Sequence, residues 1–227
     1  MDSAMVMSWL RRLLPERLVE WIRWRKAVPA LSFESSEKYW RERYAVGGNS
    51  GGGSYGALAD FKARVLNEFV QKHGVVSVIE FGCGDGNQLT LSNYPRYIGV
   101  DVSPDAVQRC RQLFVKDPSK VFLIVADYAG EQCQLSLSLD VIYHLVEDGV
   151  FEQYMQRLFD AGQNYVGVYS TNFSSDDGTT AAHVRHRRFS DWVDENRPEW
   201  SLCEHVTNTE KGSGCNFFFY AKQVRGQ

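Results

Sequence analysis

A short run of glycines and acidic residues, Glu80-Phe-Gly-Cys-Gly-Asp-Gly86, is the part of this sequence best suited to bind a ligand. It follows Val75–Glu80, an apolar and β-branched run that predicts a strand. Glycines at positions 82, 84 and 86 let the backbone turn sharply and approach a ligand, because no Cβ stands in the way. Ligands of doubly wound sheets bind beyond the carboxyl ends of the strands, so this loop predicts a binding site.

Asp101 adds a second element to this site. It ends the next predicted strand, Tyr97–Asp101, about 20 residues beyond the first glycine, which is the spacing at which an acid meets the hydroxyl pair of a ribose. One carboxylate can accept hydrogen bonds from both hydroxyls at once. The alternative is a residue that only caps the strand or shapes a turn. Together with the glycine loop, Asp101 predicts a ligand that contains a nucleoside.

The charges around the glycines favour one kind of nucleotide over another. A nicotinamide dinucleotide needs the spacing G-x-G-x-x-G, whereas this loop reads G-x-G-x-G and continues with Asn87. Glu80 and Asp85 flank the glycines, and their negative charge is unfavourable beside a pyrophosphate but favourable beside a sulfonium and an α-ammonium. The loop therefore favours S-adenosylmethionine, and an NAD-dependent oxidoreductase is the competing interpretation.

On these motifs the sequence resembles the class I S-adenosylmethionine-dependent methyltransferases over about residues 57–222. Val125–Tyr128 is similar to the adenine-contacting segment of that family, and Ser138–Leu145 resembles the segment after its fourth strand. The resemblance implies a doubly wound α/β fold with a mostly parallel seven-stranded sheet whose last strand is antiparallel. It also implies these cofactor-binding residues: Glu80, Gly82, Cys83, Gly84, Gly86, Asp101, Val102, Asp127 and Tyr128. The sequence departs from the family at Gln134, where many members carry an acid.

From residue 57 onwards the hydrophobic pattern alternates between helices and strands. Apolar residues recur at helical spacing from Leu58 to Val70, and further helices are predicted at 104–116, 151–159 and 189–195. Short apolar runs predict strands at 75–80, 97–101, 121–126, 135–139, 165–169, 200–206 and 216–222. This alternation predicts a mostly parallel sheet covered on both faces. No clear helix separates the last two strands, so we expect an antiparallel hairpin near one edge.

The first 56 residues are predicted to precede the cofactor-binding domain, which spans 57–227. A short helix is expected at 35–46, and six of the ten residues in 47–56 are glycine, which indicates a mobile loop. This loop is either a linker or a lid over the binding site. Residues 7–26 predict an amphipathic helix, rich in tryptophan and arginine, that packs on its own domain, contacts a partner subunit or lies peripherally on a membrane.

Methyl transfer to a hydroxyl benefits from a base, so histidines near the ends of the fourth and fifth strands are candidates for catalysis. His144 follows the fourth strand, and its ordinary pKa near ~6.5 suits a base at neutral pH. The alternative is a structural histidine in the pocket wall. His183 and His186 belong to the basic run 183–188, which either binds an anionic substrate or is a solvated turn. Three residues are predicted to contact the substrate: Tyr55, Asn172 and Arg187.

Composition limits the other possibilities. The 227 residues carry a formal net charge of −3, which makes a nucleic-acid partner less expected. Five cysteines without a C-x-x-C pair indicate reduced thiols in a cytoplasmic protein. Asp176, Asp177, His183 and His186 show no recognisable ligand spacing, so no metal site is predicted. No stretch approaches the ~18 apolar residues that a membrane span needs.

We therefore predict an enzyme that transfers a methyl group from S-adenosylmethionine to the hydroxyl of a small molecule, sugar or glycan. One alternative is a methyltransferase that acts on nucleic acid or protein, and another is a protein that binds S-adenosylmethionine without turning it over. The sequence leaves the identity of the acceptor and the oligomeric state open.

Overall fold

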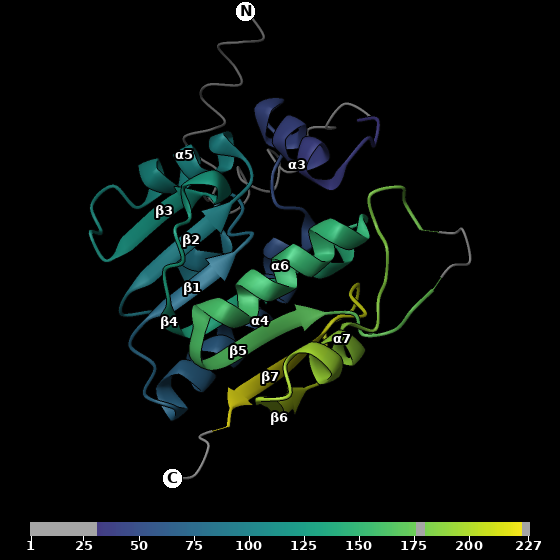
Figure 1. Cartoon of the computed structure of the whole chain (residues 1–227). Coiled ribbons are helices and arrows are strands. Elements are labelled where there is room, and N and C mark those ends of the chain that lie inside the picture. The colour runs from purple at the N-terminus through teal and green to yellow at the C-terminus, as the bar shows by residue number, and fades with distance from the viewer. Residues whose placement is uncertain (1–30, 176–179, 224–227) are drawn as a thin grey trace, which may run out of the picture.

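The computed structural model describes residues 31–175 and 180–223, which form a seven-stranded sheet with the order β3-β2-β1-β4-β5-β7-β6 (Figure 1). The strands are β1 (Val78–Phe81), β2 (Tyr97–Asp101), β3 (Lys120–Ile124), β4 (Cys133–Leu139), β5 (Gly162–Ser170), β6 (Trp200–Val206) and β7 (Asn216–Lys222). The α-helices are α3 (Ser36–Ala45), α4 (Gly56–Lys72), α5 (Pro104–Leu113), α6 (Asp148–Ala161) and α7 (Phe189–Asn196). Short 3₁₀ turns are η1 (Gly52–Ser54), η2 (Gln88–Leu91), η3 (Val125–Asp127) and η4 (Ile142–His144).

The strand directions agree with the prediction. β1 pairs in parallel with β2 and β4, and β3 and β5 extend the parallel sheet on either side. β7 lies between β5 and β6 and runs antiparallel to both, which confirms the hairpin of the last two strands. The carboxyl ends of the parallel strands therefore meet at one edge of the sheet, where the loops after β1, β2 and β4 come together.

A hydrophobic core on each face holds the helices to the sheet. On one face, α4 contributes Leu66 and Phe69, and the Phe69 ring stacks on Phe219 of β7 with 4.0 Å between the ring centroids. On the other face, α6 and α7 pack through Phe159 and Phe189. Burying each such side chain contributes ~1.5–3 kcal/mol, so this packing positions the loops at the edge of the sheet.

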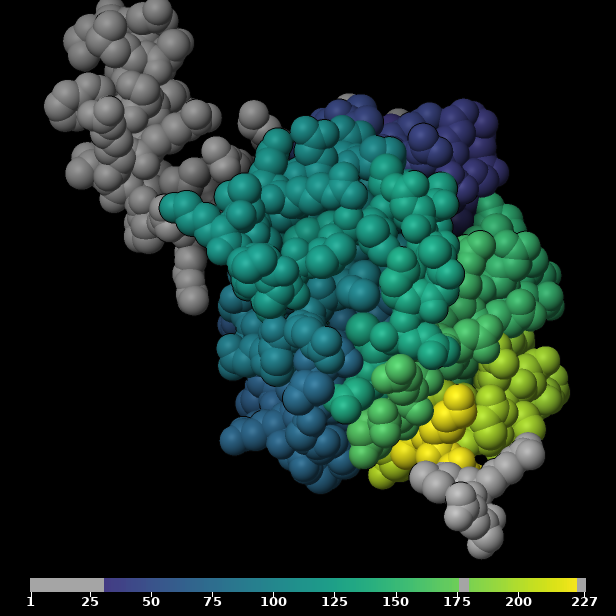
Figure 2. Space-filling view, turned by 60° about the vertical axis from the view of Figure 1, so that its left-hand side comes forward, coloured from purple at the N-terminus to yellow at the C-terminus, as the bar shows by residue number. Residues whose placement is uncertain are grey.

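Helix α3 lies over the edge at which β1 and β2 end (Figure 1). Its first residue is tied to the start of α6, because the N–H and the hydroxyl of Ser36 both donate to the Glu147 carboxylate, at 2.9 and 2.6 Å. At its other end, the Arg109 guanidinium of α5 donates to the carbonyls of Tyr44 and Gly48. The helix is thus held from both sides, and Figure 2 shows it seated against the teal α5 region and the green α6 region.

Some element bounds differ from the predicted ones. β1 begins at Val78 rather than at residue 75, because Gly74 turns the chain in a left-handed conformation (φ 61°) and the Val75 N–H still donates to the Val70 carbonyl of α4. α5 ends at Leu113 rather than near residue 116, and a turn follows it. These differences concern only where a strand begins and where a helix ends. The type and order of the predicted helices and strands are confirmed from residue 57 onwards.

Several predicted features lie outside the described residues, namely the amphipathic helix at 7–26 and the acids Asp176 and Asp177. Within the described ranges, no helix is long and apolar enough to cross a membrane. The five cysteines are all free thiols. The division of the chain after residue 56 stays a prediction, and Gly56 is the first residue of α4.

Candidate active site

A cavity of about 340 Å³ lies at the edge of the sheet where the parallel strands end. It is lined by the loop after β1 (80–85), the end of β2 (101–102), η3 (125–126) and the end of β4 (139–141). The residues between 36 and 54 that line it come from α3 and the glycine-rich loop: Ser36, Glu37, Trp40, Tyr44, Ser50 and Ser54. This is the crossover point of the sheet, where doubly wound folds bind their ligands.

The glycine loop closes around the carboxylate of Asp101. Gly84 adopts a left-handed conformation (φ 60°), and its N–H donates to Asp101 Oδ2 at 2.9 Å. The Ser103 N–H donates to Oδ1, also at 2.9 Å. Burial raises the pKa of Asp101 to about 6, although these two hydrogen bonds oppose the rise. Each carboxylate oxygen still has a second lone pair, so Asp101 is placed to accept two ligand hydroxyls.

The other glycines of the loop allow close packing. Gly82 and Cys83 line the cavity, and a Cβ on Gly82 would lie 2.4 Å from Cγ2 of Val141. Gly86 packs against α5, where a Cβ would lie 3.0 Å from Cys110 Sγ. Gly82 and Cys83 are therefore placed to touch a ligand, whereas Gly86 does not line the cavity, and cofactor binding by Gly86 stays a prediction.

Glu80 is buried where β1 ends and also lines the cavity. Its carboxylate accepts a hydrogen bond from the Tyr97 hydroxyl at 2.6 Å. Burial raises the pKa of Glu80 to about 7, and the Tyr97 hydrogen bond and the nearby charge of Lys62 limit the rise. A cationic group in the cavity would favour the ionised carboxylate, because it would offset the lost hydration. Glu80 therefore suits a ligand with a positive charge.

Asp85 joins the glycine-rich loop to the loop after β1. Its Oδ2 accepts from the Tyr55 hydroxyl at 2.6 Å and from the Ser50 N–H at 3.0 Å, while its own N–H donates to Ser50 Oγ at 3.0 Å. A Cβ on Gly84 would lie 2.3 Å from Ser50 Oγ and 2.9 Å from the Tyr44 hydroxyl oxygen. The glycine at 84 thus leaves room for residues 47–55 to lie over the cavity. Tyr55, predicted as a substrate contact, here connects the two loops.

A buried ion pair, which the sequence analysis missed, forms part of the cavity wall. Lys62 of α4 is 1% exposed, and its Nζ lies 2.6 Å from Asp140 Oδ2. Asp140 follows β4 in a left-handed conformation (φ 59°), and the Tyr143 hydroxyl donates to its other oxygen at 3.0 Å. Gln88 also lines the cavity, and its buried Oε1 has no hydrogen-bond partner among the described residues. Lys62, Asp140 and Gln88 thus stand together in the cavity wall.

The helical pattern did contain a signal for this lysine. Lys62 lies four residues after Leu58 and four before Leu66, so it belongs to the apolar face of its helix. A lysine is almost never fully buried unless it is paired. Its position on that face therefore predicts an acidic partner, although it does not say which acid.

His144 lines the cavity after β4, and neighbouring groups hold its ring. Its Nδ1 lies 3.0 Å from the carbonyl oxygen of His183. Burial lowers the pKa of His144 to about 4. The two histidine rings stack with 5.5 Å between centroids, and His183 stacks in turn on Tyr39 of α3 at 4.4 Å. The structure thus brings His144 to the cavity and places His183 directly beside it.

His186 and Asn172 do not line this cavity. Nδ1 of His186 lies 2.8 Å from Thr171 Oγ1, and Asn172 exchanges two hydrogen bonds with Ser190 near the start of α7. In the described part of the chain, no group of three or more His, Cys, Asp or Glu side chains is arranged to hold a metal ion. A role for His186 in catalysis and for Asn172 in substrate binding stays a prediction.

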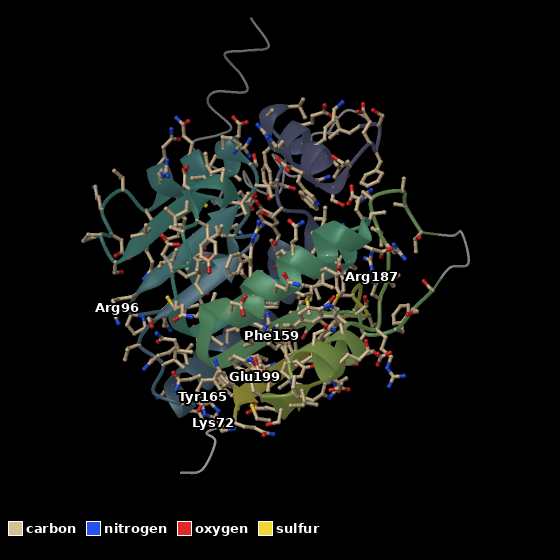
Figure 3. The ribbon with its side chains drawn as sticks, viewed as in Figure 1. Lys72, Arg96, Phe159, Tyr165, Arg187 and Glu199 are labelled. Atoms are coloured by element: carbon tan, nitrogen blue, oxygen red, sulfur yellow. The ribbon has the colours of Figure 1, made fainter. Side chains whose placement is uncertain are left out.

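Arg187 lies beside the start of α6 and also does not line the cavity (Figure 3). Its guanidinium donates to the carbonyls of Leu145 and Val146 and to the Asp148 carboxylate. It also lies over the Phe151 ring, 4.8 Å from the centroid. These contacts attach the loop after β5 to α6, and substrate binding by Arg187 stays a prediction.

Beyond Asp101 the cavity wall is mostly apolar. Val102, Val125 and Ala126 line it. Asp127 is exposed and does not line the cavity, and Tyr128 packs edge-on against Phe81 with 5.2 Å between ring centroids. Ligand contacts by Asp127 and Tyr128 therefore stay predictions, while the apolar wall just before them suits a flat aromatic group.

No protein-family model and no curated protein matches this sequence. The N-methyltransferase NodS from Bradyrhizobium japonicum WM9, solved with S-adenosyl-L-homocysteine, is 14% identical with a TM-score of 0.64, and the match covers 83% of this chain and 99% of that one. Magnesium protoporphyrin IX methyltransferase (ChlM) from Synechocystis PCC 6803, solved with the same ligand, is 11% identical with a TM-score of 0.60, covering 98% and 100%. The methyltransferase domain of bacterial CtHen1 is 18% identical with a TM-score of 0.54, covering 70% and 97%. The chain therefore has the class I methyltransferase fold, as predicted.

Proposed function

We propose that this protein is an S-adenosylmethionine-dependent methyltransferase that acts on the hydroxyl of a small molecule, sugar or glycan. The observation that carries this proposal is the buried Asp101 carboxylate, which the glycine loop holds at the edge of a cavity. The fold supports the proposal, because NodS and ChlM share it and were solved with S-adenosylhomocysteine.

The side chains that line the cavity fit the parts of this cofactor. Asp101 suits the ribose hydroxyls, and the apolar wall at Val102 and Val125 suits the adenine. The amino-acid end of the cofactor is a zwitterion, so the Lys62 ammonium suits its carboxylate and Glu80 suits its α-ammonium. NAD carries a diphosphate where this cofactor carries positive charge, and Glu80 and Asp85 disfavour a diphosphate.

S-adenosylmethionine, when bound, supplies an electrophilic methyl group. The residues of this chain then have to hold the acceptor in line with that group and keep water out, and such positioning supplies a large part of the rate of a displacement. α3 and residues 47–55 cover the cavity, and the Ser36–Glu147 and Tyr55–Asp85 hydrogen bonds hold this cover in place. This cover narrows the access of water to the cavity.

Two properties support a compact acceptor. The cavity volume of about 340 Å³ is at the low end of the range for ligand pockets, and the cofactor itself fills much of such a space. The formal net charge of −3 gives no general attraction for a nucleic acid. We therefore place a small molecule or a sugar hydroxyl ahead of a macromolecule.

Calorimetry with S-adenosylmethionine, S-adenosylhomocysteine and NAD tests the cofactor. We expect the first two to bind and NAD not to bind, and the reverse result would overturn the proposal. Formation of S-adenosylhomocysteine with a panel of alcohols, phenols and sugars then tests the acceptor. Turnover only with RNA or protein would move the acceptor to a macromolecule, and binding without turnover on any acceptor would indicate a non-catalytic protein.

A further inference from the structure

The ring of His144 is fixed in one orientation by groups from two other segments. Its Nδ1 lies 3.0 Å from the His183 carbonyl oxygen, which belongs to the loop between β5 and α7. Trp40 of α3 meets the ring edge-on, with 4.9 Å between centroids at 72°. The His183 ring lies nearly parallel to it, at 14°. A ring held in this way presents the same nitrogen to the cavity in every molecule.

The carbonyl contact determines where the proton of this ring lies. A carbonyl oxygen only accepts hydrogen bonds, so the Nδ1 of His144 must carry the proton. A neutral imidazole has one N–H, so the other nitrogen, Nε2, has a free lone pair. Within the described residues, the only hydrogen bond of the His144 side chain is the one made by Nδ1. Nε2 is thus the ring atom that is left for a ligand in the cavity.

The surroundings of His144 keep the ring neutral. Burial and, to a smaller extent, the charges of His183 and Arg43 together lower its pKa to about 4, although Asp140 and the His183 carbonyl act in the opposite direction. At physiological pH, Nε2 therefore accepts a hydrogen bond and does not donate one.

We propose that Nε2 of His144 accepts a hydrogen bond from the group to be methylated, and that the His183 carbonyl sets the tautomer that makes this contact available. This inference rests on the proposed function and deepens it. The acceptor must carry a proton on the methylated atom, as a hydroxyl does. A thioether or a tertiary amine lacks that proton and is excluded as substrate.

The proposed contact also accounts for the hydroxyl proton. As the methyl group moves from sulfur to oxygen, the C–S bond breaks, the O–C bond forms and the hydroxyl proton passes to Nε2 of His144. The resulting imidazolium is a strong acid in this buried site, so it returns the proton to water. His144 therefore starts each cycle in the same neutral state.

The loop that carries His183 is hydrogen-bonded to the residues immediately before and after His144. The Arg185 N–H donates to the Tyr143 carbonyl at 2.8 Å, and the Arg187 guanidinium donates to the Leu145 carbonyl. The His183 ring itself lies between His144 and Tyr39. We therefore regard His183 and Tyr39 as positioning residues, which act on the acceptor through His144.

The tautomer can be measured without any acceptor, by ¹⁵N NMR of the full chain labelled at its histidines. The chain has five histidines, and His144→Gln identifies the resonances of His144. We expect a protonated Nδ1 and an unprotonated Nε2, with and without S-adenosylhomocysteine. A protonated Nε2 or a charged ring at neutral pH would overturn the proposal.

Variants at the stacked rings test the positioning role. Tyr39→Leu removes the ring under His183, and we expect the resonances of His144 to shift toward a mixture of tautomers. Tyr39→Phe keeps a ring there and should give the wild-type spectrum. Phe33→Leu is the matched control, because Phe33 contacts Tyr39 with 6.3 Å between centroids and makes no ring contact with His183. An unchanged tautomer in a folded Tyr39→Leu protein would remove Tyr39 from the proposal.

Crystals of the S-adenosylhomocysteine complex, soaked in concentrated isopropanol, test the contact itself. We expect an alcohol hydroxyl within hydrogen-bond distance of His144 Nε2, and this contact should be lost in His144→Leu. Isopropanol bound elsewhere in the cavity, with Nε2 left without a donor, would overturn the proposal. If S-adenosylhomocysteine does not bind, the proposed function fails, whereas the tautomer in the ligand-free protein is decided independently by NMR.

Discussion

The Nζ of Lys62 lies 2.6 Å from Oδ2 of Asp140, and this pair connects the middle of α4 to the loop after β4. Lys62 is 1% exposed, and the side chain of Asp140 is 13% exposed. Both charges have therefore lost most of their hydration, and each depends on the other. The pair also lines the cavity, so it links the stability of the fold to the site.

Replacing only one partner of this pair should be strongly destabilising. Lys62→Met leaves the Asp140 carboxylate buried without a cation, and we expect a loss of ~3–5 kcal/mol in the free energy of unfolding. Urea denaturation measures it. The double variant Lys62→Met with Asp140→Asn should recover much of this loss, because position 140 then carries no unpaired charge and Asn tolerates the left-handed backbone. A single variant that costs less than ~1 kcal/mol would show that water reaches the pair.

Asp101 should contribute to cofactor affinity. Asp101→Ala removes a buried carboxylate that is placed to accept two ribose hydroxyls, so we expect S-adenosylmethionine binding to weaken by ~1–3 kcal/mol, or about 5- to 150-fold. Calorimetry measures the dissociation constant. Asp105→Ala, an exposed acid in the first turn of α5, is the matched control and should bind as the wild type does. Equal affinities for both variants would contradict the ribose assignment.

The fold and the first half of the site could be predicted from the sequence, for a physical reason. Glu80, the glycines and Asp101 act through their local spacing, and a strand followed by a tight turn places them wherever the sheet forms. The hairpin of β6 and β7 was predictable in the same way, because no helical pattern separates the two runs. Local patterns were sufficient wherever the neighbours in sequence are also the neighbours in space.

The remainder of the site depends on contacts between distant residues. Lys62 and Asp140 are 78 positions apart, and Tyr55 and Asp85 are 30 apart. His183 acts on His144 through its backbone carbonyl. Every residue has such a carbonyl, so the residue type does not predict this contact. A pattern of single residues cannot reveal such partners, because burial and the packing of α3 decide which of several acids or loops comes close.

The hydrogen bond between Tyr55 and Asp85 should slow the escape of the cofactor. Tyr55→Phe removes the hydroxyl that reaches the Asp85 carboxylate at 2.6 Å and should loosen residues 47–55 over the cavity. We expect dissociation of S-adenosylhomocysteine to be ~5- to 10-fold faster, since the bond to a charged group is worth ~1.5–3 kcal/mol and part of it is replaced by water. Stopped-flow competition measures this rate. Tyr220→Phe, on β7, is the control and should leave the rate unchanged.

Gly84 should tolerate no side chain. In Gly84→Ala the new Cβ would lie 2.3 Å from Ser50 Oγ, and the left-handed backbone (φ 60°) adds strain of ~1–3 kcal/mol. We expect both a lower melting temperature and weaker cofactor binding, because the loop that contacts Asp101 and the loop over the cavity move together. Gly149→Ala is the matched control, since its Cβ would meet no atom within 4 Å and α6 gains from alanine. A fully active Gly84→Ala protein would show that residues 47–55 do not close in solution.

The buried carboxyl of Glu80 should give the protein a characteristic dependence of stability on pH. Burial raises the pKa of Glu80 from an ordinary 4.5 to about 7, so the folded protein keeps a proton that the unfolded chain releases in this window. Stability contributed by the protonated group is therefore present at low pH and falls as the pH rises from about 4.5 to 7, by a total of ~3 kcal/mol at 1.36 kcal/mol per pKa unit.

The variant Glu80→Gln isolates this effect from the other titrating groups. Asp101, with its pKa raised to about 6, acts in the same direction as Glu80, and His144, with its pKa lowered to about 4, acts in the opposite one. Both stay in the variant, so the difference in unfolding free energy between wild type and variant reports the titration of Glu80 together with its charge interaction with Asp101. We expect urea denaturation to show that difference shifting in favour of Glu80→Gln from pH 4.5 to pH 8.

Saturating S-adenosylmethionine should make the wild type more stable than Glu80→Gln, because the positive charge of the cofactor favours the ionised carboxylate. A difference that does not change with pH would mean that Glu80 titrates as a solvated acid, and the electrostatic argument for this cofactor would then lose its basis.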